Sequence, residues 1–108
     1  MNALMKGQTE TDNTAFGYNA LSANVDGISN VAVGSGALSQ ATLSGNKYNT
    51  AIGVNALHSA VSGSDNVAVG TSALYSNTNG IRNIALGSSA LNSNTGGMDN
   101  VAVGYNAL

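Results

Sequence analysis

One nine-residue phrase, Asn-x-Ala-x-Gly-x-x-Ala-Leu, recurs six times along this 108-residue chain and limits what it can fold into. The copies span residues 13–21, 30–38, 49–57, 66–74, 83–91 and 100–108, so they start 17, 19, 17, 17 and 17 residues apart. A fixed period near 20 residues indicates a solenoid, in which each repeat forms one coil stacked on the next. We predict a single repeat array over residues 1–108, with a partial coil and turn at 2–12. Coils of about 17 residues then begin at Asn13, Asn30, Asn49, Asn66, Asn83 and Asn100.

The middle of the phrase has the pattern of a short β-strand. We number the phrase from its Asn as position 1, so the variable residues beside the first Ala occupy positions 2 and 4. Position 2 holds Thr14, Val31, Thr50, Val67, Ile84 and Val101, and position 4 holds Phe16, Val33, Ile52, Val69, Leu86 and Val103. Large or β-branched side chains that alternate with Ala favour a strand, and no window shows a helical period. We predict one short strand in each coil, a second extended piece around the Ala-Leu pair, and parallel pairing of coils about 4.8 Å apart.

The two faces of this strand differ in side-chain size. Position 3 is always Ala (Ala15, Ala32, Ala51, Ala68, Ala85 and Ala102). A 17-residue coil is narrow and has room inside for small side chains only, so we predict that this Ala column lines the interior. The large residues then face outward as an apolar stripe, and such a stripe marks an interface with another chain. The predicted interface is Phe16, Val31, Val33, Ile52, Val67, Val69, Ile84, Leu86, Val101 and Val103.

The energetics of a lone chain also favour association. Burying ten such side chains contributes roughly 15–30 kcal/mol, at about 1.5–3 kcal/mol each. Ordering a chain of about 100 residues costs on the order of 100–200 kcal/mol. The alternative is a monomeric β-helix, with the large side chains inside and a uniform Ala face outside.

Glycine recurs in the connectors between phrases as well. Gly27, Gly63, Gly80 and Gly97 each lie six residues after the Leu of the phrase. A Gly repeated at one turn position predicts a backbone angle that a side chain would penalise. The connector 39–48 is two residues longer than the others, and the next phrase is intact, so this insertion is predicted to bulge outward at a turn.

The phrases 13–21 and 49–57, which read Asn-Thr-Ala-x-Gly-x-x-Ala-Leu, resemble repeat arrays in bacteriophage and viral tail-fibre proteins. The array is also similar to the head repeats of YadA-like trimeric autotransporter adhesins, although its period is longer and Asn stands where those heads often have Ser. This resemblance covers essentially the whole chain and implies a left-handed parallel β-roll, with three chains side by side. It implies a structural and adhesive segment of an extracellular fibre, on a virion tail or a bacterial surface. Such a homotrimer would present multivalent contacts to a glycan or protein receptor on a host cell or other surface.

The repeated Asn of position 1 and the polar residue after each Leu are predicted to have structural roles rather than to form a binding or catalytic site. The Asn residues of position 1 could bind a ligand, but stacked identical Asn side chains satisfy one another, so we predict a hydrogen-bonded amide ladder. His58 is the only His and follows Leu57 at a turn, where other coils have Ser22, Ser39, Tyr75 and Asn92. We predict an exposed His58 with no metal or catalytic role, because it lacks the partners that such a site needs.

The residue before each Asn, position 0, is often charged. On successive coils Asp65, Arg82 and Asp99 should stack, which places Arg82 between two carboxylates as a surface ion ladder. Calcium is the alternative, since three chains would bring three Asp together in a layer, but the column is too sparse to favour it. Tyr18, Tyr75 and Tyr105 lie at variable positions, and exposed aromatic rings can stack on sugars, so they are the predicted receptor contacts.

Composition argues against other classes of protein. There is no Cys for a disulfide or a thiol nucleophile, and 7% charged residues with a net charge of −2 leave no basic stripe for nucleic acid. The sequence has no run of 18 apolar residues, so we predict no membrane insertion. We find no nucleophile–base pair, phosphate loop or acidic cluster, so we predict no enzyme, cofactor or metal.

An alternative function is a monomeric ice-binding β-solenoid, which would need flat ranks of Thr. Only Thr14 and Thr50 lie in the strand columns. The half-phrase Asn2-Ala3-Leu4 precedes the first full copy, and the chain stops in the same register at Leu108. We therefore expect a fragment of a longer array.

Overall fold

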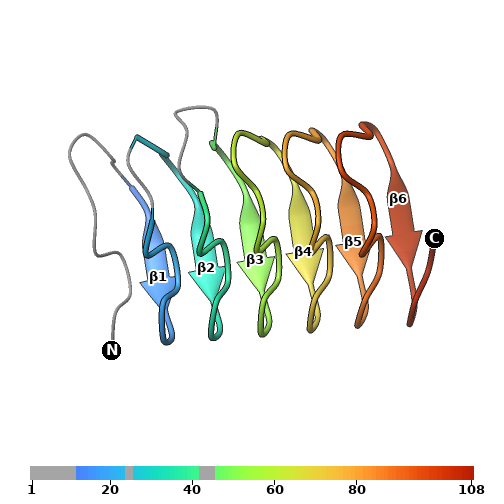
Figure 1. The fold of residues 1–108 in the computed structure, drawn as a ribbon, viewed down its shortest axis with the longest axis horizontal. Coiled ribbons are helices and arrows are strands. Elements are labelled where there is room, and N and C mark those ends of the chain that lie inside the picture. Colours follow the sequence, from blue (N-terminus) through green and yellow to red (C-terminus); the bar gives the residue numbers. More distant parts are fainter. Residues whose placement is uncertain (1–11, 24–25, 42–45) are drawn as a thin grey trace.

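The computed structural model describes residues 12–23, 26–41 and 46–108, which form a parallel β-solenoid (Figure 1). Its strands are β1 (Thr14–Phe16), β2 (Val31–Val33), β3 (Thr50–Ile52), β4 (Val67–Val69), β5 (Ile84–Leu86) and β6 (Val101–Val103). They form one six-stranded sheet in chain order, with every neighbouring pair parallel. The predicted all-β parallel solenoid is confirmed, and its six strands delimit about five turns rather than six full coils.

The pairing register places identical phrase positions on top of one another. Ala51 pairs with Ala68, and Ala68 pairs with Ala85. The same register holds across the longer connector, where Val31 pairs with Thr50. The two extra residues therefore leave the sheet undisturbed. Residues 42–45 and 1–11, on which the predicted bulge and the partial coil at 2–12 depend, lie outside the described residues.

The Ala column lies in the interior of the coil, as predicted, but the prediction that only small side chains fit there is wrong, because Leu and Asn side chains are also fully buried. Ala32, Ala51, Ala68 and Ala85 have no exposed surface, and Ala102 is 4% exposed. The Ala-Leu pair at positions 8 and 9 packs against them, with Leu21, Leu38, Leu57 and Leu74 also fully buried. The phrases from 13–21 to 83–91 therefore each hide one Leu side chain together with Ala methyl groups, whereas Leu108 of the last phrase is 84% exposed. The molecule measures 35 × 24 × 17 Å.

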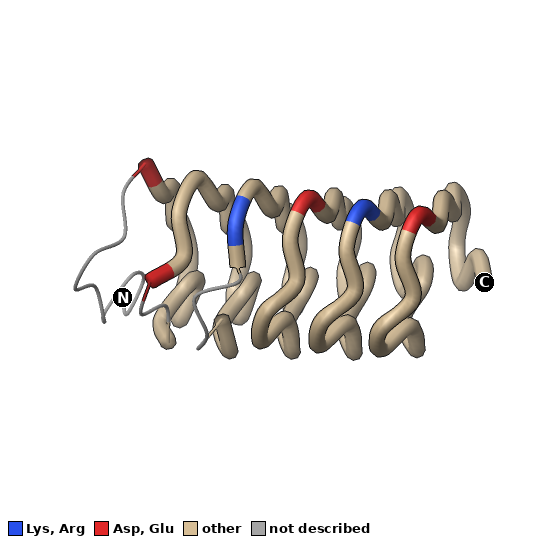
Figure 2. Tube along the Cα trace, turned by 90° about the horizontal axis from the view of Figure 1, so that it is seen from above, with Lys and Arg blue, Asp and Glu red and all other residues tan. Residues whose placement is uncertain are grey.

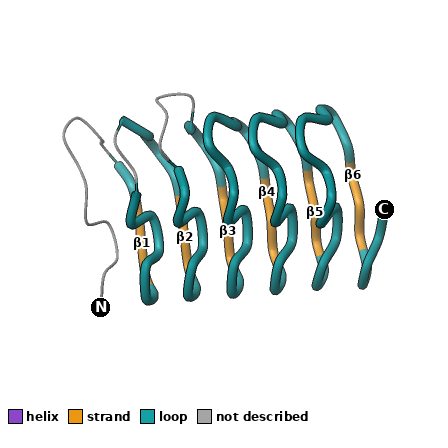
Figure 3. The backbone as a smooth tube through the Cα atoms, in the orientation of Figure 1, coloured by secondary structure: helices purple, strands orange, loops and turns teal. Residues whose placement is uncertain are grey.

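The predicted second extended piece around Ala-Leu is wrong, because these residues form a tight turn (Figure 3). Every Leu of position 9 has a left-handed backbone, with φ between 49° and 54°. That conformation costs an L-residue roughly 1–2 kcal/mol, and full burial of the Leu side chain contributes about 1.5–3 kcal/mol in return. Backbone hydrogen bonds still join the coils here, as from Leu38 N–H to the Ala56 carbonyl at 3.0 Å.

Glycine recurs at two positions of the repeat, and the structure requires it there for different reasons. At position 5, Gly70 has a φ of +132°, and a Cβ there would lie 2.6 Å from the carbonyl carbon of Gly87 on the next coil. In the connector, Gly80 has no left-handed φ, but a Cβ would lie 2.6 Å from the Gly97 carbonyl oxygen. The predicted backbone-angle requirement for the connector Gly column is therefore wrong. Close approach of adjacent coils excludes the side chain instead.

Candidate functional site

The outward side chains of the six strands form one surface, which we call the strand face and which is apolar except for Thr14 and Thr50. It consists of the residues at positions 2 and 4 of the phrase. Phe16, Val101 and Val103 are 62–69% exposed, whereas Ile52, Val69, Ile84 and Leu86 are 36–40% exposed. Val31, Val33 and Val67 are half-buried. The outward orientation predicted for these residues is confirmed, and the face that they form is uncharged.

Two further columns flank the strand face. Position 0 precedes it with Asp12, Ser29, Tyr48, Asp65, Arg82 and Asp99, and position 6 follows it with Tyr18, Ser35, Val54, Thr71, Ser88 and Tyr105. The position-0 residues all have φ between 55° and 61°, which turns the chain sharply just before each strand. On the last three coils Asp65, Arg82 and Asp99 follow one another along one edge of the rod, so charges of alternating sign lie on adjacent coils there (Figure 2). The edge formed by position 6 is uncharged.

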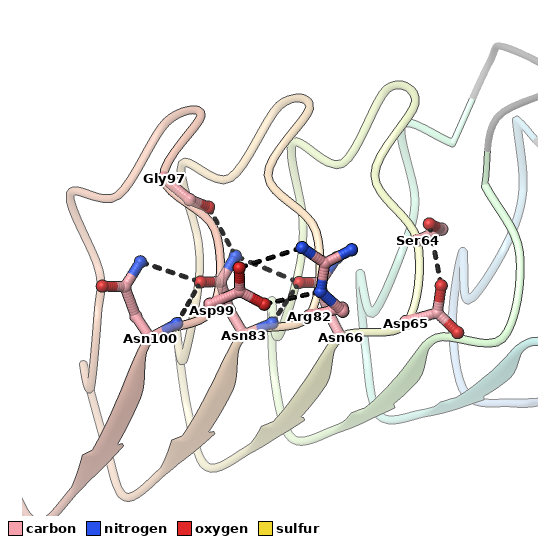
Figure 4. A network of polar contacts seen from close by, with 8 residues as sticks. All are labelled: Ser64, Asp65, Asn66, Arg82, Asn83, Gly97, Asp99 and Asn100. Carbon is pink, nitrogen blue, oxygen red and sulfur yellow. Dashed lines mark hydrogen bonds and ion pairs between the residues drawn. The ribbon is translucent and has the colours of Figure 1, made fainter.

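The charged edge contains one bidentate ion pair between adjacent coils. Arg82 Nε donates to Asp99 Oδ1 at 2.5 Å and Arg82 Nη2 donates to Asp99 Oδ2 at 2.9 Å (Figure 4). Asp65 instead accepts a hydrogen bond from the Ser64 hydroxyl at 3.0 Å. Arg82 lies between Asp99 and Asp65 on successive coils, as predicted, and both carboxylates raise its pKa, Asp99 more than Asp65. The predicted ion ladder is reduced to one pair, because the planar guanidinium hydrogen-bonds to Asp99 only. The hydrogen bond from Arg82, reinforced by its charge, lowers the pKa of Asp99.

Replacing Arg82 with Gln should raise the pKa of Asp99 toward its ordinary value. A depressed pKa in the folded chain means that the pair stabilises the fold above the unfolded pKa, and that this stabilisation is lost as the pH falls through the folded pKa. Carboxyl chemical shifts in an NMR titration measure the change. Ser64→Ala is the control, since it alters the partner of Asp65 and leaves Asp99 untouched. An unchanged Asp99 titration in R82Q would show that the pair does not form in solution.

A buried amide ladder runs beside the strands and confirms the prediction for position 1. The Asn66 Oδ1 accepts the backbone N–H of Asn83 at 3.0 Å and its side-chain Nδ2 at 3.2 Å (Figure 4). Asn83 Oδ1 accepts the equivalent pair from Asn100 at 3.1 and 2.9 Å. Asn30, Asn49, Asn66 and Asn83 have no exposed surface, so they hold coils together and cannot reach a ligand.

A second, shorter amide contact was not predicted. Asn94 Nδ2 donates to Asn77 Oδ1 at 2.9 Å, and both side chains also donate to a connector Gly carbonyl. Both residues lie three positions after the Leu of the phrase, where Ala41 and Ala60 stand in earlier coils. Their equal spacing from the phrase was the signal that could have identified them.

The aromatic residues do not form one binding patch. His58 and Tyr75 are half-buried rather than exposed, and their rings stack with centroids 4.9 Å apart and planes 4° apart. Burial lowers the pKa of His58, which favours its neutral form in the stack. Tyr18 and Tyr105 are 58% and 78% exposed, but they belong to the first and last phrases. The structure therefore does not bring the three predicted receptor contacts together.

Within residues 12–23, 26–41 and 46–108, no three His, Asp or Glu side chains are grouped as metal ligands. The same residues contain no helix that is long and apolar enough to cross a membrane. Comparisons with protein-family models, curated proteins and solved structures gave no match to this chain.

Proposed function

We propose that this chain is a structural and adhesive segment of a trimeric surface fibre, in which three left-handed β-rolls lie side by side and bury their strand faces. The strand face is the observation that supports the proposal. It is an apolar surface along the whole sheet, of a kind that soluble monomers seldom expose over more than a few hundred Å². The apolar core of a coil is at most one Leu and a few Ala side chains, so association would supply burial that the single chain lacks.

The rod also suits the mechanical role of a fibre. Hydrogen bonds join successive coils at the strands, at the amide ladder and through the Ala-Leu turns. Stacked coils of this kind depend on their neighbours alone, so the array can extend without a larger core. Three identical chains would show each exposed group three times, and such multivalency raises avidity by roughly 10²–10⁴ without any new contact.

The resemblance of the phrase to tail-fibre and YadA-like repeats supports an extracellular location, on a virion or a bacterial surface. The proposed receptor is a cell-surface glycan or protein. An ice-binding surface is not supported, because the strand face has Thr only at Thr14 and Thr50. Native mass spectrometry tests the assembly directly and should give three times the chain mass of 10.7 kDa. A folded species of single-chain mass would overturn the proposal.

Replacing Val69 with Asp should dissociate the assembly, and Val67→Asp should act alike. Each chain would place a carboxylate in an apolar contact, and burying an unpaired charge costs several kcal/mol. We expect affinity to fall by roughly a thousandfold or more, equivalent to about 4 kcal/mol. Light scattering over a concentration series measures the loss.

The matched control is Asn79→Asp, which adds the same charge on an exposed connector residue away from the strand face. It should leave the mass of the assembly unchanged. If V69D and N79D assemble equally well, the strand face is not the interface.

A further inference from the structure

Asn79 differs from every other asparagine of the chain in the residue that follows it. It is the only Asn that precedes a Gly, whereas all the Asn residues of position 1 precede Thr, Val or Ile. Because Gly has no side chain, the backbone nitrogen of Gly80 is sterically open to the amide carbon of the Asn79 side chain. The connector between β4 and β5 therefore contains one chemically labile dipeptide, since Asn is among the residues most prone to spontaneous degradation.

The side-chain amide of Asn79 is exposed and weakly held. Its Oδ1 receives one long contact, at 3.5 Å, from the Thr78 hydroxyl. Within the part of the chain that the structure describes, its Nδ2 donates no hydrogen bond. The buried amide of Asn66, by contrast, takes part in four hydrogen bonds to Asn49, Gly80 and Asn83. Asn79 can therefore rotate its amide toward its own backbone, whereas a ladder Asn would first have to break these bonds.

The Gly80 nitrogen also has no hydrogen bond to any residue in the ranges 12–23, 26–41 and 46–108. The nitrogen that follows other Asn residues is often held. Val67 N–H donates to the Asn83 carbonyl at 2.8 Å, and Thr78 N–H donates to the Thr95 carbonyl at 2.9 Å. Such an N–H would have to leave its acceptor before it could give up its proton and react. The Gly80 nitrogen has no such bond to lose.

We propose that Asn79 is a site of spontaneous deamidation in the folded chain. The Gly80 nitrogen gives its proton to hydroxide or water and attacks the Asn79 amide carbon. The new C–N bond closes a five-membered succinimide, and the side-chain nitrogen leaves as ammonia. One water molecule then opens the ring. Attack at the side-chain carbonyl gives Asp, whereas attack at the backbone carbonyl gives isoaspartate, in which the main chain runs through the former side chain.

The two products have different consequences for the connector. Asp adds a charge at an exposed position and leaves the backbone unchanged. Isoaspartate adds one methylene to the main chain directly before Gly80, whose carbonyl accepts from Asn66 Nδ2 at 2.8 Å and from Asn77 Nδ2 at 3.2 Å. The adjacent coil leaves little room there, since a Cβ on Gly80 would lie 2.6 Å from the Gly97 carbonyl oxygen. Isoaspartate therefore displaces Gly80 and weakens its bonds to the amide ladder.

This inference does not depend on the association of chains. Asn79 lies on a connector away from the strand face, so it stays accessible to water whether or not the strand faces are buried. A failure of the proposed assembly would leave the deamidation site in place, and the absence of deamidation would leave the assembly in place.

Timed incubation of the folded full chain in warm, mildly alkaline buffer tests the proposal. Trypsin cleaves after Lys47 and Arg82, so Asn79 lies in the peptide 48–82, and tandem mass spectrometry distinguishes the Asn residues within it. We expect Asn79 to acquire the mass shift of deamidation several-fold faster than any other Asn, relative to a zero-time digest. Asn79→Gln is the matched control, because it keeps the amide but would have to close a less favourable six-membered ring. It should abolish the shift at residue 79.

Two results of this incubation would overturn the proposal. One is faster deamidation of another residue, such as Asn92 before Ser93. The other is deamidation of Asn79 in urea but not in the folded chain, which would show that the fold protects it. The consequence for packing has its own measurement. Chains in which isoaspartate methyltransferase labels residue 79 should exchange the amide hydrogen of Asn83 several-fold faster than Asn79→Asp chains, and equal exchange would contradict the predicted displacement of the connector.

Discussion

Replacing Ala68 with Leu should unfold the coil of β4 and divide the array into two shorter pieces. Ala68 has no exposed surface, and its register partners above and below are the equally buried Ala51 and Ala85. A Leu there has to displace backbone on the opposite wall of a narrow coil. Overpacking usually costs 1–3 kcal/mol, and we expect at least about 3 kcal/mol because the coil cannot widen without breaking its contacts with both neighbours. Urea unfolding measures the change in free energy, and hydrogen exchange of residues 66–74 locates it.

The matched control is Val69→Leu, which adds a Leu one residue further along and on the opposite face of the same strand. Position 4 already has Leu86 in the next coil, so the backbone accepts this side chain there. The free energy of unfolding of the single chain should change by less than about 0.5 kcal/mol. Equal stability of A68L and V69L would mean that the interior is wider than the structure shows.

Replacing Asn66 with Ala should also destabilise the chain strongly, because four hydrogen bonds depend on this side chain. Its Oδ1 accepts the backbone N–H and the Nδ2 of Asn83, and its own Nδ2 donates to Asn49 Oδ1 at 3.1 Å and to the Gly80 carbonyl at 2.8 Å. Ala leaves several of these groups buried without a partner, and each such group costs about 1–3 kcal/mol. We expect a loss of roughly 3–5 kcal/mol, with faster amide exchange at Asn83.

Asn79→Ala is the control for this substitution, since it removes the same amide from an exposed connector residue. Its free energy of unfolding should stay within about 0.5 kcal/mol of the unsubstituted chain. If N66A is no less stable than N79A, water replaces the ladder bonds and the column is not buried in solution.

The architecture was predictable from sequence because one phrase repeats with constant spacing. Equal spacing forces equal positions to stack, so the parallel register and the inward Ala column follow from geometry. The conformation of Ala-Leu did not follow, because Leu favours extended or helical backbone in isolation. The missed signal is position 7, which is Asn or Gly in four of the six phrases and Ser in the other two. Gly and Asn adopt the left-handed conformation more readily than other residues, and every residue at this position has a positive φ.

Contacts between side chains on adjacent coils were only partly predictable. Sequence places Asp65 and Asp99 at equal separation from Arg82, one coil to either side, and so cannot tell which carboxylate receives the guanidinium. The stacking of His58 on Tyr75 could have been predicted from the sequence. Both residues directly follow the Leu of their phrase and therefore lie on adjacent coils. Gly80 is required because its connector approaches the connector of the next coil closely. The distance between two connectors cannot be derived from the sequence of one coil.

The amide ladder gives the array a growth direction. Each Asn side-chain oxygen accepts from the coil that comes later in the chain, as Asn49 does from Asn66 and Asn66 does from Asn83. The ribosome synthesises the coils in that same order. The Asn Oδ1 of each folded coil is therefore available to accept the backbone N–H of the Asn in the coil that is synthesised next. Synthesis can therefore proceed as templated winding, in which no segment waits for a distant partner before it folds.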